Sequence, residues 1–235
     1  MPDELPAPPA ARLVSVRVGP VAPLGPAGVL SGFVKRPVDG PVWVGPLGLA
    51  GDQQADRSVH GGPEKAVYAY PQGHYAPWRT EFPQHAALWV PGGVGENLTV
   101  AGQAENGVCL GDVFRLGSVL LLQVTQPRQP CFKFGLRFGD PRLPRAMVQT
   151  GRSGWYLRVL APGPIAAGEA FTLVERPNPR WPVARLNRLI VARSAPAADW
   201  RELAELPGLA VGWQGTARGV CEGREQRFSC SPDLL

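Results

Sequence analysis

The sequence lacks the residue patterns of several common enzyme classes. Its four cysteines follow no CxxC spacing and its three histidines show no paired spacing, which argues against a zinc or dithiol redox site. It has no glycine–x–serine–x–glycine elbow, the usual signature of an α/β-hydrolase. It also has no Walker motif and no dinucleotide fingerprint. Any catalytic activity must therefore depend on a different set of residues.

Long apolar runs and dense charge blocks are also missing. No run of about 18 apolar residues exists, which excludes a transmembrane helix on sequence grounds. Residues 1–11 carry Asp3 and Glu4 and lack the basic and apolar regions of a signal peptide. We therefore expect a cytoplasmic protein without membrane contact, whose thiols stay reduced. The net charge of +5 suits an anionic ligand, but the absence of any block of five like charges disfavours nucleic acid as the partner.

Glycine and proline are abundant instead, with 29 and 27 of the 235 residues. They are spread without a period, so they indicate many turns and short elements, and a mainly β fold with some α structure. The alternation of Val14, Val16 and Val18 with polar residues predicts a half-buried strand over 12–18. Further short strands are expected over 42–44, 98–100, 107–110, 112–116, 118–124, 155–160 and 170–174, helices over 74–82 and 143–150, and a turn over 162–164. Residues 66–70 are expected to form a strand or to begin a helix.

The composition changes over residues 175–182, where Arg-Pro-Asn-Pro-Arg-Trp-Pro is typical of a linker. Beyond it, Val183, Leu186, Leu189 and Ile190 form a helical apolar stripe, and two similar patterns follow. We therefore predict a flexible start over 1–11, a β-rich domain over 12–176, a three-helix domain over 181–222 and a loose tail over 223–235.

Cys131 is the most informative residue. It follows Gln126-Pro127-Arg128-Gln129-Pro130, and its two prolines predict a rigid loop after a strand. Arg128 and Lys133 lie close in the chain, and positive neighbours favour the thiolate, which is the nucleophilic and metal-binding form. The alternative is a buried cysteine that acts as a small hydrophobic residue, which is how we interpret Cys109 between Val108 and Leu110.

Two glycine-rich segments accompany this loop. The segment 51–63 places His60 directly before Gly61 and Gly62, so that an imidazole lies beside bare backbone amides that can bind an anion. The segment 93–98 contains Gly95 and Asn97 and leads into a strand. Each segment alone is equally compatible with an ordinary turn. Glu96 and Asp112 form a second, weaker candidate, as an acid/base pair.

Taken together, these segments resemble the MOSC family, the domain found at the C-terminus of molybdenum cofactor sulfurases, and most closely its YiiM-like branch. The resemblance covers roughly residues 12–220, and it rests on ordered motifs at compatible spacing. The motifs lie at residues 51–63, 66–78, 95–99, 108–115, 126–133 and 151–160, followed by the helical tail. It implies a MOSC-type β-barrel domain followed by a small three-helix domain.

The resemblance also implies a molybdenum–pterin cofactor, with Cys131 as the ligand of molybdenum. By position, His60, Gly61, Gly95, Asn97 and Arg128 are the residues expected to line the cofactor pocket. Arginine forks and backbone amides suit the phosphate of the pterin, and Arg57 and Arg152 are further candidates for it. Aromatic residues such as Tyr70, Phe132 or Trp155 are candidates to stack on a planar substrate.

The activity implied by the resemblance is reduction of N-hydroxylated compounds, such as hydroxylaminopurine-type base analogues. No iron–sulfur cysteine set is present, so a separate reductase is expected to supply electrons. Pyridoxal phosphate is not expected, because no Schiff-base lysine stands out, and a homodimer is plausible. The alternative is a carrier of cofactor or sulfur without turnover, and a third interpretation is a basic protein that binds nucleic acid through its helical tail.

Overall fold

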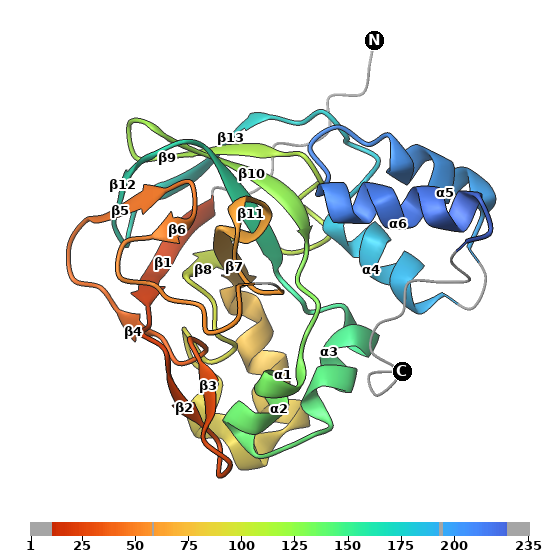
Figure 1. The fold of residues 1–235 in the computed structure, drawn as a ribbon. Coiled ribbons are helices and arrows are strands. Elements are labelled where there is room, and N and C mark those ends of the chain that lie inside the picture. The colour runs from red at the N-terminus through yellow and green to blue at the C-terminus, as the bar shows by residue number, and fades with distance from the viewer. Residues whose placement is uncertain (1–10, 58, 193–194, 225–235) are drawn as a thin grey trace.

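The computed structural model describes residues 11–57, 59–192 and 195–224. Seven strands close into a β-barrel in the upper part of the molecule (Figure 1). Around the barrel they are β1 (Ala11–Val18), β13 (Ala170–Glu175), β9 (Val113–Leu116), β10 (Leu120–Pro127), β11 (Trp155–Ala161), β7 (Val67–Pro71) and β8 (Leu98–Ala101). The β1–β13 pairing closes the ring, with Ala11 opposite Phe171, and only β7 and β8 run parallel.

The barrel forms because its strands alternate. In β10 the residues Leu120, Leu122 and Val124 point into the apolar core and are fully buried, while Leu121 and Gln123 between them are only half-buried. Shorter strands surround the barrel, and one of them, β4 (Arg36–Pro37), pairs with β1. A small sheet consists of β12 (Gly163–Ile165), β5 (Val42–Gly45) and β6 (Gly48–Leu49). A hairpin consists of β2 (Ala22–Leu24) and β3 (Val29–Ser31).

A second, aromatic core lies below the barrel in Figure 1, between β7 and a group of helices. These helices are the 3₁₀ turns η2 (Gln72–His74) and η3 (Pro83–Leu88), and α1 (Tyr75–Glu81), α2 (Phe132–Phe138) and α3 (Leu143–Thr150). A further 3₁₀ turn, η1 (Pro63–Lys65), lies beside β11. Trp78 stacks on Trp89 and Trp89 stacks on Phe138, with ring centroids 5.3 and 4.2 Å apart. This packing fixes the position of α2, which begins directly after Cys131.

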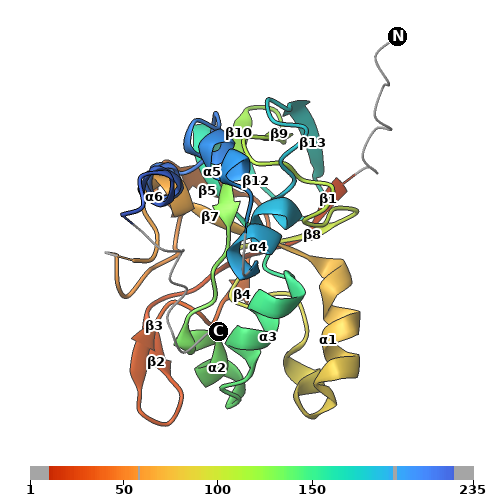
Figure 2. The same ribbon diagram turned by 90° about the vertical axis from the view of Figure 1, so that its right-hand side faces the viewer.

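The C-terminal helices α4 (Val183–Val191), α5 (Ala197–Ala204) and α6 (Val211–Cys221) pack beside the barrel (Figure 2). Their buried residues, including Leu186, Leu203 and Trp213, continue the apolar core of the barrel without a break. The β-barrel with a small C-terminal three-helix region is thus confirmed. Within the described residues, no helix has both the length and the apolar character needed to cross a membrane.

Some local predictions were wrong. Residues 107–110 form no full strand: Cys109 makes only an isolated antiparallel bridge to Pro182, and its N–H donates to the Asp112 carboxylate at 2.8 Å. The supposed turn at 162–164 belongs largely to β12, which pairs with β5. The supposed linker is packed, since Trp181 is buried and the Asn178 amide donates to the carbonyls of Leu110 and Pro207. The flexible start and the loose tail fall almost entirely outside the described residues.

Candidate functional site

An open cavity lies at the ends of β7, β10 and β11, between the barrel and the aromatic core. Its empty space, together with the solvent at its mouth, is about 680 Å³, and the enclosed part is about 100 Å³. Five stretches of chain form its wall: residues 31–35 after β3, 52–66, 68 on β7, 95–97, and 128–133 together with Tyr156 of β11. Residues far apart in the sequence are therefore brought to one place.

The residue expected to bind molybdenum and the five expected to line the cofactor pocket all line this one cavity. They are Cys131, His60, Gly61, Gly95, Asn97 and Arg128. Their shared location is a finding, whereas the role of each residue remains a prediction.

Cys131 combines the features expected of a reactive thiol. It is half-buried, lies in the cavity wall and has no disulfide partner. Its backbone is extended, and its carbonyl accepts the N–H of Phe134 at 3.0 Å, which ties the residue to the first turn of α2. The short stretch 126–131 therefore holds the sulfur between a barrel strand and a packed helix. Among the described residues, no group of three His, Cys, Asp or Glu side chains could hold a metal ion, so a metal at Cys131 would need most of its ligands from a cofactor.

Arg128 is a buried cation without a carboxylate partner among the described residues, and it is only 6% exposed. Its guanidinium carbon lies 5.0 Å from the ring of Tyr68, 5.5 Å from that of Phe33 and 5.6 Å from that of Phe134. Burial alone would lower the pKa of Arg128, but Tyr68, Tyr156 and Cys131 outweigh it, and the net pKa is raised. The group stays charged, and because a buried charge is costly unless it is paired, this arrangement favours an anion in the cavity.

The cavity is positively charged overall. Lys133 is 8% exposed and pairs with no carboxylate of the described residues. Lys65 also lines the cavity, where burial lowers the pKa of its ammonium. Among the described residues of the wall, Asp52 is the only acidic one, and the Lys35 ammonium is bonded to it. Lys35 neutralises Asp52, so three cations, Arg128, Lys133 and Lys65, remain without a carboxylate in the described wall, which is the electrostatics of an anion-binding site.

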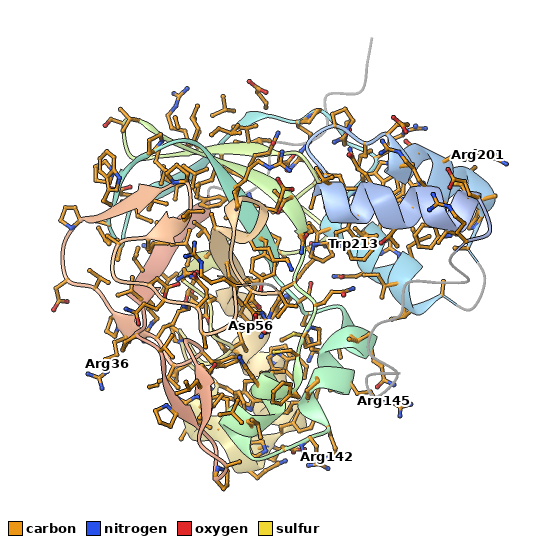
Figure 3. All side chains as sticks on the ribbon, in the orientation of Figure 1. Arg36, Asp56, Arg142, Arg145, Arg201 and Trp213 are labelled. Atoms are coloured by element: carbon orange, nitrogen blue, oxygen red, sulfur yellow. The ribbon has the colours of Figure 1, made fainter. Side chains whose placement is uncertain are left out.

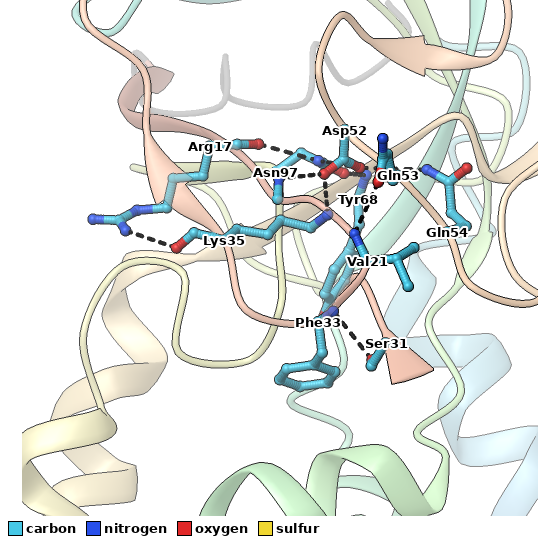
Figure 4. Close-up of polar contacts among 11 residues, drawn as sticks. Arg17, Val21, Ser31, Phe33, Lys35, Asp52, Gln53, Gln54, Tyr68 and Asn97 are labelled. Atoms are coloured by element: carbon cyan, nitrogen blue, oxygen red, sulfur yellow. Dashed lines mark hydrogen bonds and ion pairs between the residues drawn. The ribbon is translucent and has the colours of Figure 1, made fainter. Parts of the chain in front are cut away.

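Asn97 holds three segments together (Figure 4). Its Oδ1 accepts the backbone N–H of Tyr68 at 3.1 Å, while its Nδ2 donates to the Arg17 carbonyl at 3.2 Å and to Asp52 Oδ2 at 3.0 Å. Both amide hydrogens are therefore used within the protein. Asn97 positions β7 and the loop of Asp52 around the cavity, and its capacity to bind a ligand directly is limited to a spare lone pair.

His60 and the glycines shape the opposite wall. Burial lowers the pKa of His60, and the charges of Lys133, Arg128 and Lys65 lower it further, so the imidazole is neutral at pH 7. Gly61 has φ +80°, and no acceptor for its N–H exists among the described residues, so this amide is available to an anion. Gly95 has φ +85°, and a Cβ there would lie 3.2 Å from the Phe33 ring, so only glycine allows this close approach.

Several other candidates lie away from the cavity. Tyr70 and Trp155 are fully buried in the two cores, Phe132 is 59% exposed, and Arg152 is paired with Glu81. Arg57 does not line the cavity but a neighbouring surface hollow, which shares Asp52, Gln53 and Gln54 with it. Neither Glu96 nor Asp112 lines the cavity, and Asp112 is paired with Arg176. Cys109 is packed, as expected, and burial together with Asp112 raises its pKa to about 11.

The sequence reasoning did not identify Lys35, Tyr68 and Tyr156 as wall residues. No sequence signal marks Lys35. Tyr68 and Tyr156 lie inside the matching motifs, and strand alternation could have placed Tyr156 on the face opposite Trp155.

Comparison with known proteins agrees with this geometry. The model for the MOSC domain matches residues 56–172, and that for the "YiiM-like, 3-alpha helix domain" matches residues 181–219. Protein YiiM of Escherichia coli (strain K12) is 39% identical over 193 residues, which cover 81% of this chain and 84% of the relative. The chain belongs to the MOSC domain family. Within it, the similarity to YiiM and to the three-helix domain points to the YiiM-like branch.

Two further members bear on structure and activity. The crystal structure of YiiM from Geobacillus stearothermophilus superposes with a TM-score of 0.75 at 34% identity, covering 90% of this chain and 99% of that one. A protein of Gibberella moniliformis (strain M3125 / FGSC 7600) named "Reductase" is 40% identical over 206 residues. These residues are 87% of this chain but 36% of that relative, so this chain spans about a third of it.

Proposed function

We propose that this protein reduces N-hydroxylated compounds with a molybdenum–pterin cofactor whose metal is bound by the Cys131 thiolate. The observation that carries the proposal is the combination in one cavity of an accessible thiol with two buried cations, Arg128 and Lys133, that lack carboxylate partners. Membership of the MOSC family, which is associated with this cofactor, and a relative named "Reductase" support it.

The residues present fit such a cofactor. A thiolate is a soft ligand suited to a transition metal. The buried guanidinium of Arg128 and the free N–H of Gly61 suit the phosphate of the pterin, because both donate to anionic oxygen. Tyr68 and Tyr156 add flat surfaces beside it, with ring centroids 5.3 Å apart. The absence of any multi-ligand cluster among residues 11–57, 59–192 and 195–224 agrees with a metal held mainly by its organic ligand.

The overall reaction is R–NHOH + 2 e⁻ + 2 H⁺ → R–NH₂ + H₂O. When bound, the cofactor supplies the two-electron chemistry that breaks the N–O bond. The protein holds the thiolate still through the 126–131 segment, keeps the anionic cofactor in place through its cations, and offers proton-bearing groups at Lys65 and Tyr156 in the same wall. Electrons are proposed to come from a separate reductase.

The test is elemental analysis of protein purified from a host that makes the cofactor, followed by a hydroxylaminopurine reduction assay with a reduced dye. We expect bound molybdenum and substrate-dependent oxidation of the dye, and loss of both in Cys131→Ala with the melting temperature unchanged. The matched control is Cys221→Ser, since Cys221 is exposed on α6. Molybdenum content that stays the same in Cys131→Ala refutes the ligand role, and bound molybdenum without turnover would support a carrier instead.

The alternative of a nucleic-acid-binding protein receives no support from the distribution of charge. Arg36, Arg142, Arg145 and Arg201 project from the molecule in different directions (Figure 3). Nucleic-acid-binding domains typically gather such side chains on one face or along one helix.

A further inference from the structure

A second hollow adjoins the Cys131 cavity, between β10, β11 and the start of α6. Four residues line both spaces: His60, Lys65, Gln129 and Tyr156. The remaining wall of this groove consists of Val59, Glu64, Gln126, Ala210, Gly212 and Trp213. Figure 3 shows Trp213 at the end of α6 that faces the barrel. A molecule seated in this groove can therefore extend into the cavity that holds the thiol.

Two glutamine side chains in the groove lack hydrogen-bond partners. Gln126 is only 7% exposed, and its side-chain amide bonds to no described residue, but its polar atoms are not sealed from solvent. Gln129 has a buried Nε2 without a partner. Buried polar groups in native proteins are nearly always paired, and an unpaired one costs about 1–3 kcal/mol. The buried, unpartnered Nε2 of Gln129 and the accessible amide of Gln126 beside it point to a ligand that carries both donors and acceptors.

The rest of the groove suits a flat and neutral ligand. Tyr156 offers an aromatic face, and Val59 and Ala210 add apolar surface. A Cβ at Gly212 would meet no atom within 4 Å, so α6 leaves open space here. Glu64, the one carboxylate that the described part of the chain contributes to this wall, is already paired with Arg158 at 2.7 Å. The groove therefore offers amide hydrogen bonds and stacking, and no free negative charge.

We propose that this groove is the subsite for the body of the substrate, a flat nitrogen heterocycle whose ring edge is bound by Gln126 and Gln129 while its N–OH end reaches the Cys131 cavity. A carboxamide can donate and accept side by side, which matches an edge where a ring nitrogen lies next to an N–H group. The inference rests on the proposed function for the direction of the ligand, but binding in the groove does not require turnover.

The first experiment compares Gln126→Leu and Gln129→Leu with the wild type, and uses Gln149→Leu on the exposed face of α3 as the matched control. In molybdenum-loaded protein we expect KM for hydroxylaminopurine to rise on the order of 10-fold, the effect of losing about one hydrogen bond. For acetamidoxime, which has no ring, we expect KM to stay unchanged. Molybdenum content and melting temperature should not fall, because leucine replaces an unpaired amide.

The second experiment measures adenine binding by calorimetry, which needs no reaction. The subsite is supported if adenine binds the wild type and binds the glutamine variants more weakly. If hydroxylaminopurine is nevertheless not reduced, the proposed function is refuted while the subsite stands. Turnover with unchanged KM in both variants, together with no adenine binding, overturns the subsite and assigns the two amides to ordered water.

Discussion

Arg128→Met is the most demanding test of the site, because it separates binding from folding. Removing a buried cation that has no carboxylate partner relieves a desolvation cost of several kcal/mol. It also removes contacts with the rings of Tyr68, Phe33 and Phe134, each worth about 0.5–2 kcal/mol. These effects oppose one another, so the melting temperature of the cofactor-free protein should change little or rise.

The cofactor-loaded protein should respond differently. A charge-assisted hydrogen bond to an anion contributes about 1.5–3 kcal/mol, which corresponds to a roughly 10- to 150-fold loss of affinity when it is removed. The stabilisation that bound cofactor confers on the fold should shrink by the same free energy, if cofactor is in excess. The cofactor affinity of Arg128→Lys should lie between those of the wild type and Arg128→Met, because lysine keeps the charge but lacks the planar guanidinium fork.

The assay is a pair of thermal melts, with and without cofactor, together with molybdenum content per chain after desalting. Arg115→Met is the control, since Arg115 is exposed on β9 away from the cavity. If Arg128→Met destabilises the cofactor-free protein by several kcal/mol while molybdenum content stays at the wild-type level, Arg128 is a structural residue and the anion-site argument is refuted.

Three further predictions concern neighbouring features. Cys109→Ser should retain activity. Folded protein treated with iodoacetamide at pH 8 should be alkylated at Cys131 but not at Cys109, because the pKa of Cys109 is raised to about 11. Mass spectrometry of the labelled peptides would contradict this prediction if Cys109 reacted as fast as Cys131. Burial raises the pKa of Glu96, so the folded protein holds this proton more tightly than the unfolded chain, and ionisation of Glu96 costs stability as pH rises above about 4.3. The melting temperature of Glu96→Gln should therefore rise relative to that of the wild type between pH 5 and pH 9. A difference in melting temperature that does not change with pH would disprove the role of Glu96 ionisation. Gly95→Ala should lose about 1–2 kcal/mol from its positive φ alone, and denaturant unfolding that shows no loss would mean that the loop can rearrange.

Strand alternation explains how much of the fold could be predicted. The strand at 12–18 follows from alternation, the strand predicted over 118–124 was recognised as an apolar run after a glycine and is observed over 120–127, and helix α3 was predicted with its observed bounds, 143–150. Helix α2 was missed, because it has only seven residues and contains Gly135. Its signals are weak: Phe134 and Phe138 one turn apart, and Gly139 in the left-handed conformation at its end. Closure of the barrel by β1 and β13 could not be derived from local patterns, because the paired residues lie about 160 positions apart.

The candidate site, too, could be predicted only in part from local sequence patterns. Local chemistry identified Cys131, and the resemblance to the MOSC family placed five further residues beside it. Neither indicated which aromatic residues face the cavity. Trp155 and Tyr156 are consecutive on β11 and therefore point to opposite faces, but alternation does not say which face is the barrel interior. Packing decides this, because Trp155 fills the core between apolar strands and leaves Tyr156 outside.

The barrel itself explains why the site lies at its rim. Barrels of about eight strands have interiors just wide enough to be filled by side chains. Here seven strands enclose Leu98, Val100, Phe114, Leu122 and Leu157, all fully buried, so no ligand of cofactor size fits inside. Binding must then use the segments that leave the strands, and the aromatic core beneath them supplies the rigidity that loops lack. Cys131 lies at this junction, directly between the end of β10 and the start of α2, where a thiol can be both accessible and fixed.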